Sequence, residues 1–366
     1  MSNFIETKLS INKKYGQGTV FSFGDVGLGC RSIPTGISVL DKATGIGGLP
    51  VGRIVELYGP ESCGKSTVLL HTAVNAQKQG LAVLYEDFEN ALDRKYAEAL
   101  GLDLSPEKFG ISQPADLEQG MAIAEEFIKS NSVGLIIVDS LAAMRPRAEM
   151  QDAKGHEREI GDKIPLAAQG HAMAEVLRRL TPEISKSNVC MCFINQIRQD
   201  LAAAQRGITK YTTPGSKTLR FYASMRIEFR KIGSVRGKVE NPNTGDLEDY
   251  AAGIEVEANI CKNKVAPPFS RGVFYLRHGK GACPILNTIQ LSISRGFIEA
   301  GKAGWYSLPK VGDFEGEKVR GMEGVLNYYE THKEVFDLLK EGVDSLVCYK
   351  KEDVVVSTDS VKEIDL

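Results

Sequence analysis

The chain has 366 residues, 42% hydrophobic and 25% charged, so it can bury a sizeable core and carry one or two small additional domains. Its 45 basic and 47 acidic residues give a formal net charge of −2, which excludes a global positive field that would attract nucleic acid. No run of about 18 apolar residues and no charged-then-apolar leader is present, so we expect a cytoplasmic protein without a membrane partner. Seven scattered cysteines without a C-x-x-C pair argue against a disulfide framework or a zinc ribbon.

Composition and periodicity divide the chain into four predicted parts. Residues 1–28 combine a weakly amphipathic stretch with a glycine-punctuated turn and short strand near 15–23, so we expect an oligomerisation segment that packs on the core or on a neighbouring subunit. Strands alternate with helices over 29–283, which predicts an α/β core whose mostly parallel sheet is covered on both faces. A smaller α/β domain is expected over 284–345, and a loosely ordered acidic tail over 346–366.

The stretch 59–67 has the pattern G-x-x-x-x-G-K-[ST], with a predicted strand over 52–58 before it and a predicted helix over 66–77 after it. Glycines at both ends let backbone N–H groups face a phosphate chain, Lys65 neutralises the β and γ phosphates, and Ser66 ligates Mg²⁺. Strand, glycine loop and helix N-terminus form an anion-binding arrangement, and a chance glycine turn is the less favoured alternative. The residues expected to bind nucleotide are Gly59, Pro60, Glu61, Ser62, Cys63, Gly64, Lys65, Ser66 and Thr67.

Two predicted strands end in acidic side chains on the side of the sheet where ligands bind. The strand over 81–87 is followed by Glu89 and Asp93. The apolar strand over 134–140 carries Asp139, which we expect to act on the magnesium ion from its outer coordination sphere, as the acid that triphosphate-loop enzymes place on the strand beside the loop. The alternative is that Asp139 only caps the end of its strand.

Two long polar loops are predicted, over 150–165 and 197–218, and the second follows a strand end, as a loop on the catalytic side should. Between Arg198 and Lys238, ten basic residues stand against two acidic ones, a pattern typical of polyanion binding. Beyond these loops the α/β alternation gives way to antiparallel strands. The remaining predicted elements are helices over 116–130 and 166–180, the second ending before Thr181-Pro182, and strands over 188–196, 221–230 and 253–264.

Six segments carry a further indication: Gly47 to Thr67, Glu89-Asn-Ala-Leu-Asp93, Phe193-Ile-Asn-Gln-Ile-Arg198, Phe221-Tyr-Ala-Ser224, Lys262-Asn-Lys-Val-Ala-Pro-Pro-Phe269 and Ala303-Gly-Trp-Tyr-Ser307. In combination they resemble the bacterial RecA family of homologous recombinases, over nearly the whole chain. The resemblance implies an α/β fold: a RecA-type P-loop ATPase core with a mostly parallel central sheet, a short N-terminal segment and a small α/β C-terminal domain.

The resemblance also assigns catalytic roles. Glu89 matches the carboxylate that orients the attacking water, and Gln196 matches the amide that senses the γ-phosphate and relays it to the second loop. Lys262 and Lys264 match a pair that reaches across the subunit boundary to the neighbour's ATP. Two lysines one residue apart on a strand face the same way, although a solvated sheet edge is an alternative.

Three further positions match nucleotide and subunit contacts of the family. Asp93 and Tyr96 match residues that hold adenine by a hydrogen bond and by ring stacking, and they share a helix face because they lie one turn apart. Phe221 matches an aromatic residue of the subunit contact, where Lys262 and Lys264 also belong.

The two long loops resemble those that line the filament axis and hold single-stranded DNA by its backbone. Such phosphate contacts carry affinity without reading sequence. Arg230 and Lys231 match a basic pair that attracts incoming duplex DNA, with a solvated face as the alternative. The candidate DNA-binding residues are Arg178, Arg198, Gly215, Ser216, Lys217, Arg230 and Lys231.

Several positions depart from the family's pattern, including a shorter N-terminal segment, a longer second loop and His171 in place of a usual arginine. Cys63 lies inside the phosphate loop at a helix N-terminus, which should lower its pKa. We therefore expect alkylation or oxidation of Cys63 to block ATP binding. The departures suggest a divergent member of the family, for which a phage origin is one interpretation.

The resemblance thus implies a DNA-dependent ATPase that uses ATP and Mg²⁺, assembles into a helical filament on single-stranded DNA and exchanges strands with homologous duplex DNA in recombination and repair. Repressor or loading proteins are further candidate partners. Two other interpretations remain open, namely an ATP-gated single-stranded-DNA-binding scaffold without strand exchange, and a hexameric translocase on the same fold. The set of Glu89, Gln196, Lys262 and Lys264 argues against the first, and the C-terminal unit with Trp305 argues against the second.

Overall fold

The computed structural model describes residues 3–16, 19–20, 30–152, 155–159, 162, 168–199, 211–212, 216–240 and 247–345. The chain separates into two units, 1–31 and 32–366. The first unit contains helix α1 (Asn3–Tyr15), which buries none of its residues and exposes Phe4 and Leu9. Tyr15, predicted to begin a turn and strand, instead ends this helix, and most of the remainder of that predicted strand lies outside the described residues.

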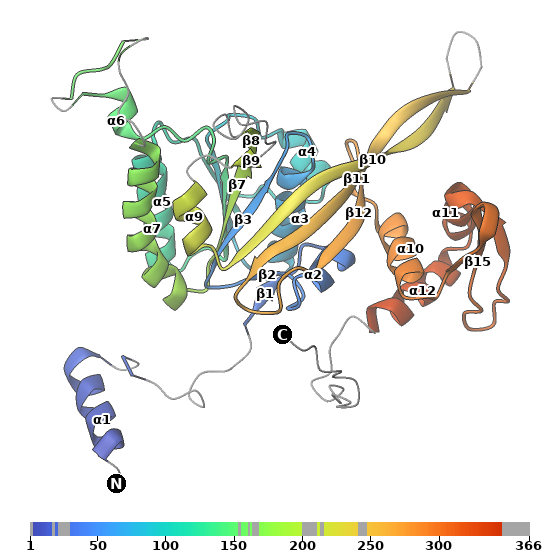
Figure 1. Cartoon of the computed structure of the whole chain (residues 1–366), viewed down its shortest axis with the longest axis horizontal. Coiled ribbons are helices and arrows are strands. Elements are labelled where there is room, and N and C mark those ends of the chain that lie inside the picture. Colours follow the sequence, from blue (N-terminus) through green and yellow to red (C-terminus); the bar gives the residue numbers. More distant parts are fainter. Residues whose placement is uncertain are drawn as a thin grey trace, which may run out of the picture. The chain divides into compact units, whose positions relative to one another are not determined.

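A nine-stranded sheet organises the second unit, as Figure 1 shows. Five neighbouring pairs are parallel, from β10 through β3, β7, β6 and β4 to β5, and the three pairs on the other side of β10 are antiparallel. This confirms the predicted α/β class and the predicted change to antiparallel pairing. The strands, in sheet order, are β13 (Gly281–Ala282), β12 (Arg271–Arg277), β11 (Leu247–Asn263), β10 (Met225–Glu240), β3 (Ile54–Gly59), β7 (Cys190–Gln196), β6 (Leu135–Asp139), β4 (Val83–Asp87) and β5 (Phe109–Ser112).

Each face of the sheet has its own apolar core, because successive strand residues point to opposite sides. Along β6, Leu135 and Ile137 join the core beneath helix α3 (Lys65–Lys78), whereas Ile136 and Val138 join the core shared with α5 (Leu117–Ser130). Helices α7 (Ala168–Lys186) and α9 (Ser216–Tyr222) complete the second layer. The shorter elements are β1 (Ser32–Ile33), α2 (Ser38–Ala43), β2 (Leu49–Pro50), α4 (Arg94–Ala99), α6 (Arg147–Met150), β8 (Arg198–Gln199) and β9 (Tyr211–Thr212).

The C-terminal part has a separate core around the fully buried ring of Tyr329. Trp305 lies in its small antiparallel sheet and is 45% exposed. Residues 346–366, the predicted acidic tail, lie outside the described residues. The elements are α10 (Pro284–Ser294), β14 (Glu299–Ala300), the 3₁₀ helix η2 (Lys302–Gly304), β15 (Trp305–Ser307), β16 (Lys318–Arg320), α11 (Gly321–Thr331) and α12 (Lys333–Ser345).

Two predicted boundaries are wrong. Helix α7 does not stop before Pro182 but continues through it to Lys186, because Leu180 and Ile184 on either side are buried in the same core. The burial of these apolar side chains stabilises the helix by more than is lost with the backbone hydrogen bond that Pro182 cannot donate. The predicted strand over 221–230 begins only at Met225, since residues 216–222 form α9, which buries Leu219 against the second core.

The β10–β11 hairpin is longer than predicted. Strand β3 pairs only with residues 225–228 of β10, and β12 pairs only with residues 253–259 of β11. The outer parts of the two strands therefore pair only with each other, and Figure 1 shows this ribbon extending beyond β12. In the part of the chain that the structure describes, no helix is long and apolar enough to cross a membrane.

Candidate nucleotide site

The loop between β3 and α3 has the form that its glycines predict. Gly64 caps α3 with a left-handed backbone (φ 87°), and a Cβ there would lie 2.2 Å from Cδ1 of Leu276. A Cβ on Gly59 would lie 2.3 Å from the carbonyl oxygen of Phe229. Neither position has room for a side chain, so the loop stays compact in front of the helix N-terminus, where free N–H groups favour an anion.

Lys65 is folded onto this loop. Its side chain is buried, and Nζ donates to the carbonyl oxygens of Gly59 at 3.1 Å and Pro60 at 2.6 Å. The ammonium group is thus held where the loop and the first turn of α3 meet. A lysine charge beside free helical N–H groups fits the phosphates of a nucleotide.

Asp139 and Ser66 also meet, as predicted for a magnesium site. The Ser66 hydroxyl donates to Oδ2 of Asp139 at 2.8 Å, and the Tyr85 hydroxyl donates to the same oxygen at 2.6 Å. Burial raises the pKa of Asp139, while these two hydrogen bonds lower it in part. One hydroxyl and one carboxylate are hard oxygen donors that suit Mg²⁺, which commonly takes its remaining ligands from phosphates and water.

Glu89 and Gln196 lie together at the carboxyl ends of neighbouring strands. Oε1 of Glu89 accepts a hydrogen bond from the Ser140 hydroxyl and another from Nε2 of Gln196, which lies 3.5 Å away. The three residues follow or end β4, β6 and β7, which are adjacent in the sheet. Glu89 is exposed, so its carboxylate can also reach a water molecule.

Asp93 and Tyr96 are placed by helix α4. Oδ1 of Asp93 accepts from the backbone N–H groups of Lys95 at 2.8 Å and Tyr96 at 3.2 Å, so Asp93 caps the helix. The Tyr96 hydroxyl and the Thr67 hydroxyl lie 3.0 Å apart and share a hydrogen bond. This contact holds α4 beside the phosphate loop, and the predicted adenine contacts of Asp93 and Tyr96 stay predictions.

Lys262 and Lys264 lie elsewhere. Nζ of Lys262 donates to the carbonyl oxygens of Arg220 at 2.6 Å and Phe221 at 3.1 Å, and burial together with the Lys264 charge lowers the pKa of Lys262. The premise that both lysines lie on one strand is wrong, because β11 ends at Asn263 and Lys264 follows it. Phe221 is 74% exposed, and its role in a subunit contact stays a prediction.

The strand register fixes the level of the lysine pair. Lys262 lies opposite Arg226, and Arg226 lies opposite Glu56, the third of the six residues of β3. The backbone of Lys264 bonds to Ser224, and Ser224 bonds to Ile54 at the amino end of that strand. The phosphate loop follows Gly59 at the carboxyl end of that strand. The lysines therefore stand toward the opposite end of the sheet from the loop of their own chain.

A buried network of hydrogen bonds connects Arg226, which lies opposite Lys262, with Gln196 at the nucleotide site. The Glu56 carboxylate accepts from Nδ2 of Asn195 at 2.9 Å and from Nε of Arg226, and Arg226 stacks over the Tyr58 ring at 4.4 Å. Asn195 in turn accepts from the backbone N–H of Gln196 at 2.9 Å. Sequence patterns did not single out this network, because it depends on which strands become neighbours.

Sequence reasoning also missed Ser140 and Tyr85. Ser140 follows Asp139 at a strand end, and Tyr85 lies in a strand whose carboxyl end was already predicted to face the ligand. The register of β4 against β6 brings Tyr85 to Asp139, and the sequence of either strand alone does not predict that register.

The candidate DNA-binding residues are only partly described. Arg178 is exposed on α7, Lys231 is exposed on β10, and Nη2 of Arg230 donates to both carboxylate oxygens of Glu228 at 3.0 and 2.9 Å. The Glu228 charge thus offsets that of Arg230. Gly215 lies outside the described residues, and only the main chain is described for Arg198 in β8 and for Ser216 and Lys217 in α9.

The predicted reactivity of Cys63 is wrong. The residue is 0% exposed, and burial raises the pKa of its thiol even though the Lys65 charge lowers it in part. Cys63 packs in the core beneath α3 instead of facing solvent at the helix end. Desolvation therefore outweighs the helix N-terminus, and the expected block of ATP binding by alkylation loses its basis.

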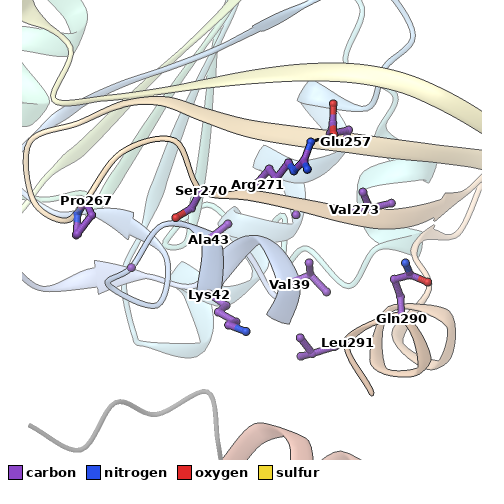
Figure 2. A pocket seen from close by; sticks show the side chains of 12 residues that line it. Val39, Lys42, Ala43, Glu257, Pro267, Ser270, Arg271, Val273, Gln290 and Leu291 are labelled. Carbon is purple, nitrogen blue, oxygen red and sulfur yellow. Dashed lines mark ion pairs between the residues drawn. The ribbon is translucent and has the colours of Figure 1, made fainter. Parts of the chain in front are cut away.

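A separate groove of about 970 Å³ lies between α2, β12 and α10 (Figure 2). In this view Arg271 points toward Glu257, with Nη1 and Oε1 3.7 Å apart, and Lys42, Gln290 and Leu291 lie along the lower edge. None of the predicted nucleotide-binding or DNA-binding residues lines the groove. The candidate nucleotide site is therefore identified from its side chains and hydrogen bonds, and it does not coincide with this groove.

Comparisons with known proteins agree with the geometry. The RecA N-terminal domain family matches residues 3–283. The chain is 38% identical to Protein RecA of Aquifex aeolicus (strain VF5) over 344 residues, which cover 93% of this chain and 91% of the relative. It is 34% identical to Protein RecA of Acinetobacter baumannii over 369 residues, covering 100% and 97%. It is 37% identical to Protein RecA of Borrelia hermsii over 345 residues, covering 93% and 89%.

Proposed function

The chain belongs to the RecA family and is an ATP-dependent recombinase of DNA recombination and repair, and from this premise we propose a filament mechanism. Subunits assemble head to tail on single-stranded DNA, with one ATP between each pair, and the filament exchanges strands with homologous duplex DNA. The family is shown to have DNA-dependent ATPase activity. The particular DNA partners and the filament assembly are part of our proposal. A cytoplasmic location belongs to the same proposal.

The proposal that two subunits share one ATP site rests on the positions of the phosphate loop and of the two lysines. The phosphate loop follows the carboxyl end of β3, whereas Lys262 is level with Glu56, the third of its six residues. Lys264 donates its backbone N–H to Ser224, which in turn bonds to Ile54 at the amino end of β3. The Lys262 ammonium group is held by the carbonyl oxygens of Arg220 and Phe221 instead of by its own loop, so we assign both lysines to the loop of a neighbouring copy. A head-to-tail contact between copies brings one end of a subunit against the opposite end of the next, which is the geometry of an open helical assembly.

Within one subunit, we assign binding to the phosphate loop, where Lys65 neutralises phosphate charge and Ser66 and Asp139 hold the metal. A bound Mg²⁺ would supply further neutralisation and fix the orientation of the phosphates. Glu89 orients the attacking water, since its exposed carboxylate keeps acceptor capacity beside the bonds from Ser140 and Gln196. Asp93 and Tyr96 hold the base, because α4 is anchored to the loop through Thr67.

Gln196 couples this site to DNA. It is the last residue of β7, so the second predicted DNA loop, 197–218, follows it directly, and β8 begins within that loop at Arg198. A contact between the Gln196 amide and the γ-phosphate would compete with the hydrogen bond from Gln196 to Glu89. This competition would shift the conformation of the loop over 197–218 that follows Gln196. Arg178, Arg198, Gly215, Ser216 and Lys217 then hold the single strand, and Arg230 and Lys231 attract duplex DNA.

The domain plan forms part of the proposal. Residues 1–28 interlock subunits, 29–283 form the ATPase and DNA-binding core, 284–345 form the C-terminal domain, and 346–366 form the acidic tail. Phe221 lies at the subunit contact, because an aromatic ring that is 74% exposed beside the carbonyl that holds Lys262 fits a partner surface.

A mixing experiment tests the shared site. Lys65→Ala and Lys264→Ala variants should each lose DNA-dependent ATP hydrolysis. In an equimolar mixture about a quarter of the contacts would pair an intact loop with an intact lysine, so about a quarter of the activity should return. Lys310→Ala provides a control, because Lys310 is an exposed lysine paired with Glu315 at 2.5 Å.

Absence of any recovery, with both variants still assembling, would place the lysines in the site of their own chain. Strand exchange between circular single-stranded DNA and homologous linear duplex then separates a recombinase from a scaffold. A scaffold would coat the single strand under ATP control and give no joint molecules.

A further inference from the structure

Tyr85 brings a second hydroxyl to the carboxylate of the proposed magnesium site. Its O–H donates to Oδ2 of Asp139 at 2.6 Å, and the Ser66 hydroxyl donates to the same oxygen at 2.8 Å. Within the described part of the chain no donor reaches Oδ1 of Asp139. One carboxylate oxygen is thus held by the protein while the other stays available.

The strand register explains this contact. In the parallel pair of β4 and β6, Tyr85 lies opposite Ile137, and Asp139 follows two residues later on the same face. This diagonal separation is within reach of an aromatic side chain. Tyr85 is 2% exposed and packs against Phe109 with ring centroids 6.3 Å apart. The hydroxyl is therefore presented by a ring that has little freedom to move.

We propose that Tyr85 is a positioning residue for the metal site, where its hydroxyl fixes the Asp139 carboxylate so that Oδ1 faces the metal or a metal-bound water. This inference rests on the proposed function, in which Ser66 and Asp139 hold the metal. When Ser66 turns toward the metal, Tyr85 remains as the donor that keeps Oδ2 in place. Partners that orient a ligating carboxylate commonly change metal affinity by 10-fold to 100-fold when removed.

The Tyr85→Phe variant tests the inference, because it removes one oxygen and keeps the ring against Phe109. Binding of a fluorescent ATP analogue is measured while Mg²⁺ is titrated, and again in excess EDTA. We expect the Mg²⁺ midpoint to rise about tenfold, with metal-free nucleotide binding unchanged. Binding of Mn²⁺, followed by electron paramagnetic resonance in the presence of ATP, should weaken by the same factor.

Tyr275→Phe is a matched control, since the Tyr275 hydroxyl donates to Oε1 of Glu255 at 3.0 Å, outside the predicted site. It removes a hydrogen bond of the same kind and should leave the Mg²⁺ titration unchanged. If Tyr85→Phe also leaves it unchanged, or weakens nucleotide binding equally with and without metal, Tyr85 has only a structural role.

Asp139→Asn separates this inference from the proposed function. If Asp139→Asn does not alter the Mg²⁺ dependence, the metal site itself is wrongly placed. If it does, the Tyr85→Phe effect should disappear in the double variant, because the hydroxyl acts through that carboxylate. Additive effects of the two substitutions would overturn the positioning role.

Discussion

The carboxyl group of Glu86 should make the stability of this protein fall as pH rises. Glu86 follows Tyr85 in β4 and therefore lies on the opposite face of the sheet, the face that also buries Leu84 and Val138. It is 0% exposed, and among the residues that the structure describes, neither of its carboxylate oxygens has a hydrogen-bond partner. Burial raises the pKa of Glu86 from 4.5 to about 8.

The direction follows from proton binding. The folded chain holds the Glu86 proton more tightly than the unfolded chain, so deprotonation favours unfolding. The stabilisation is fully present below pH 4.5 and is lost as pH rises to about 8. Between pH 6 and pH 8 the loss is about 2 kcal/mol, since each unit of pKa difference corresponds to about 1.4 kcal/mol. The Glu86→Gln variant keeps the shape of the side chain and lacks this titration.

Urea unfolding followed by circular dichroism at pH 6, 7 and 8 measures the effect. The free energy of unfolding of the wild type should fall by about 2 kcal/mol more than that of Glu86→Gln. The difference between the two proteins is decisive, because burial also raises the pKa of Asp41 to about 7, and Asp41 titrates in both. Parallel pH profiles for wild type and variant would refute the reasoning.

A matched control lies on the same face of the sheet. Glu125 is buried on α5, and although burial raises its pKa, hydrogen bonds from Lys129 and Arg179 hold the pKa below its ordinary value. Glu125→Gln should therefore lower stability throughout this window and leave the slope between pH 6 and pH 8 unchanged. An altered slope in this variant would mean that any buried carboxyl substitution perturbs the profile.

Three further outcomes are expected. Gly64→Ala should cost about 2 kcal/mol in unfolding free energy, measured by urea titration, because the left-handed backbone strains any residue with a Cβ. Iodoacetamide should label Cys63 only as the protein unfolds, and peptide mapping that finds it modified in the native state would contradict its burial. Glu56→Gln should cost about 3 kcal/mol by leaving the buried Arg226 charge uncompensated, whereas replacement of Glu56 and Arg226 together by apolar residues should restore much of that loss.

The sequence predicted the phosphate-binding apparatus because its chemistry is local. Gly59, Gly64, Lys65 and Ser66 lie within eight residues, and the backbone between a strand and a helix alone decides where they point. The family resemblance singled out Glu89 and Gln196 separately, and the structure adds their contact. It is physically possible because the carboxyl ends of adjacent parallel strands converge.

Other predictions failed where tertiary burial opposes a local rule. Pro182 predicts a helix end by its missing N–H, yet the apolar residues around it keep α7 on the core. A helix N-terminus predicts a reactive Cys63, yet the side chain points into the core. In each case the deciding quantity is the number of apolar atoms that surround the residue, which no short window of sequence contains.

Strand β4 shows why the remaining features needed the structure. Tyr85 and Glu86 are neighbours in sequence, and their side chains lie on opposite faces of the sheet with opposite consequences. The Tyr85 hydroxyl donates to a carboxylate, whereas the Glu86 carboxylate has no donor within the described ranges of the chain. Because the sheet lies between them, the two effects should be independent, with Tyr85→Phe changing the Mg²⁺ midpoint and Glu86→Gln changing the pH profile of stability. A double variant should show both changes undiminished, since the two side chains point to opposite faces of the sheet. Strong coupling would mean that β4 itself shifts when either side chain changes, and that the metal site and the opposite core are mechanically connected through one strand.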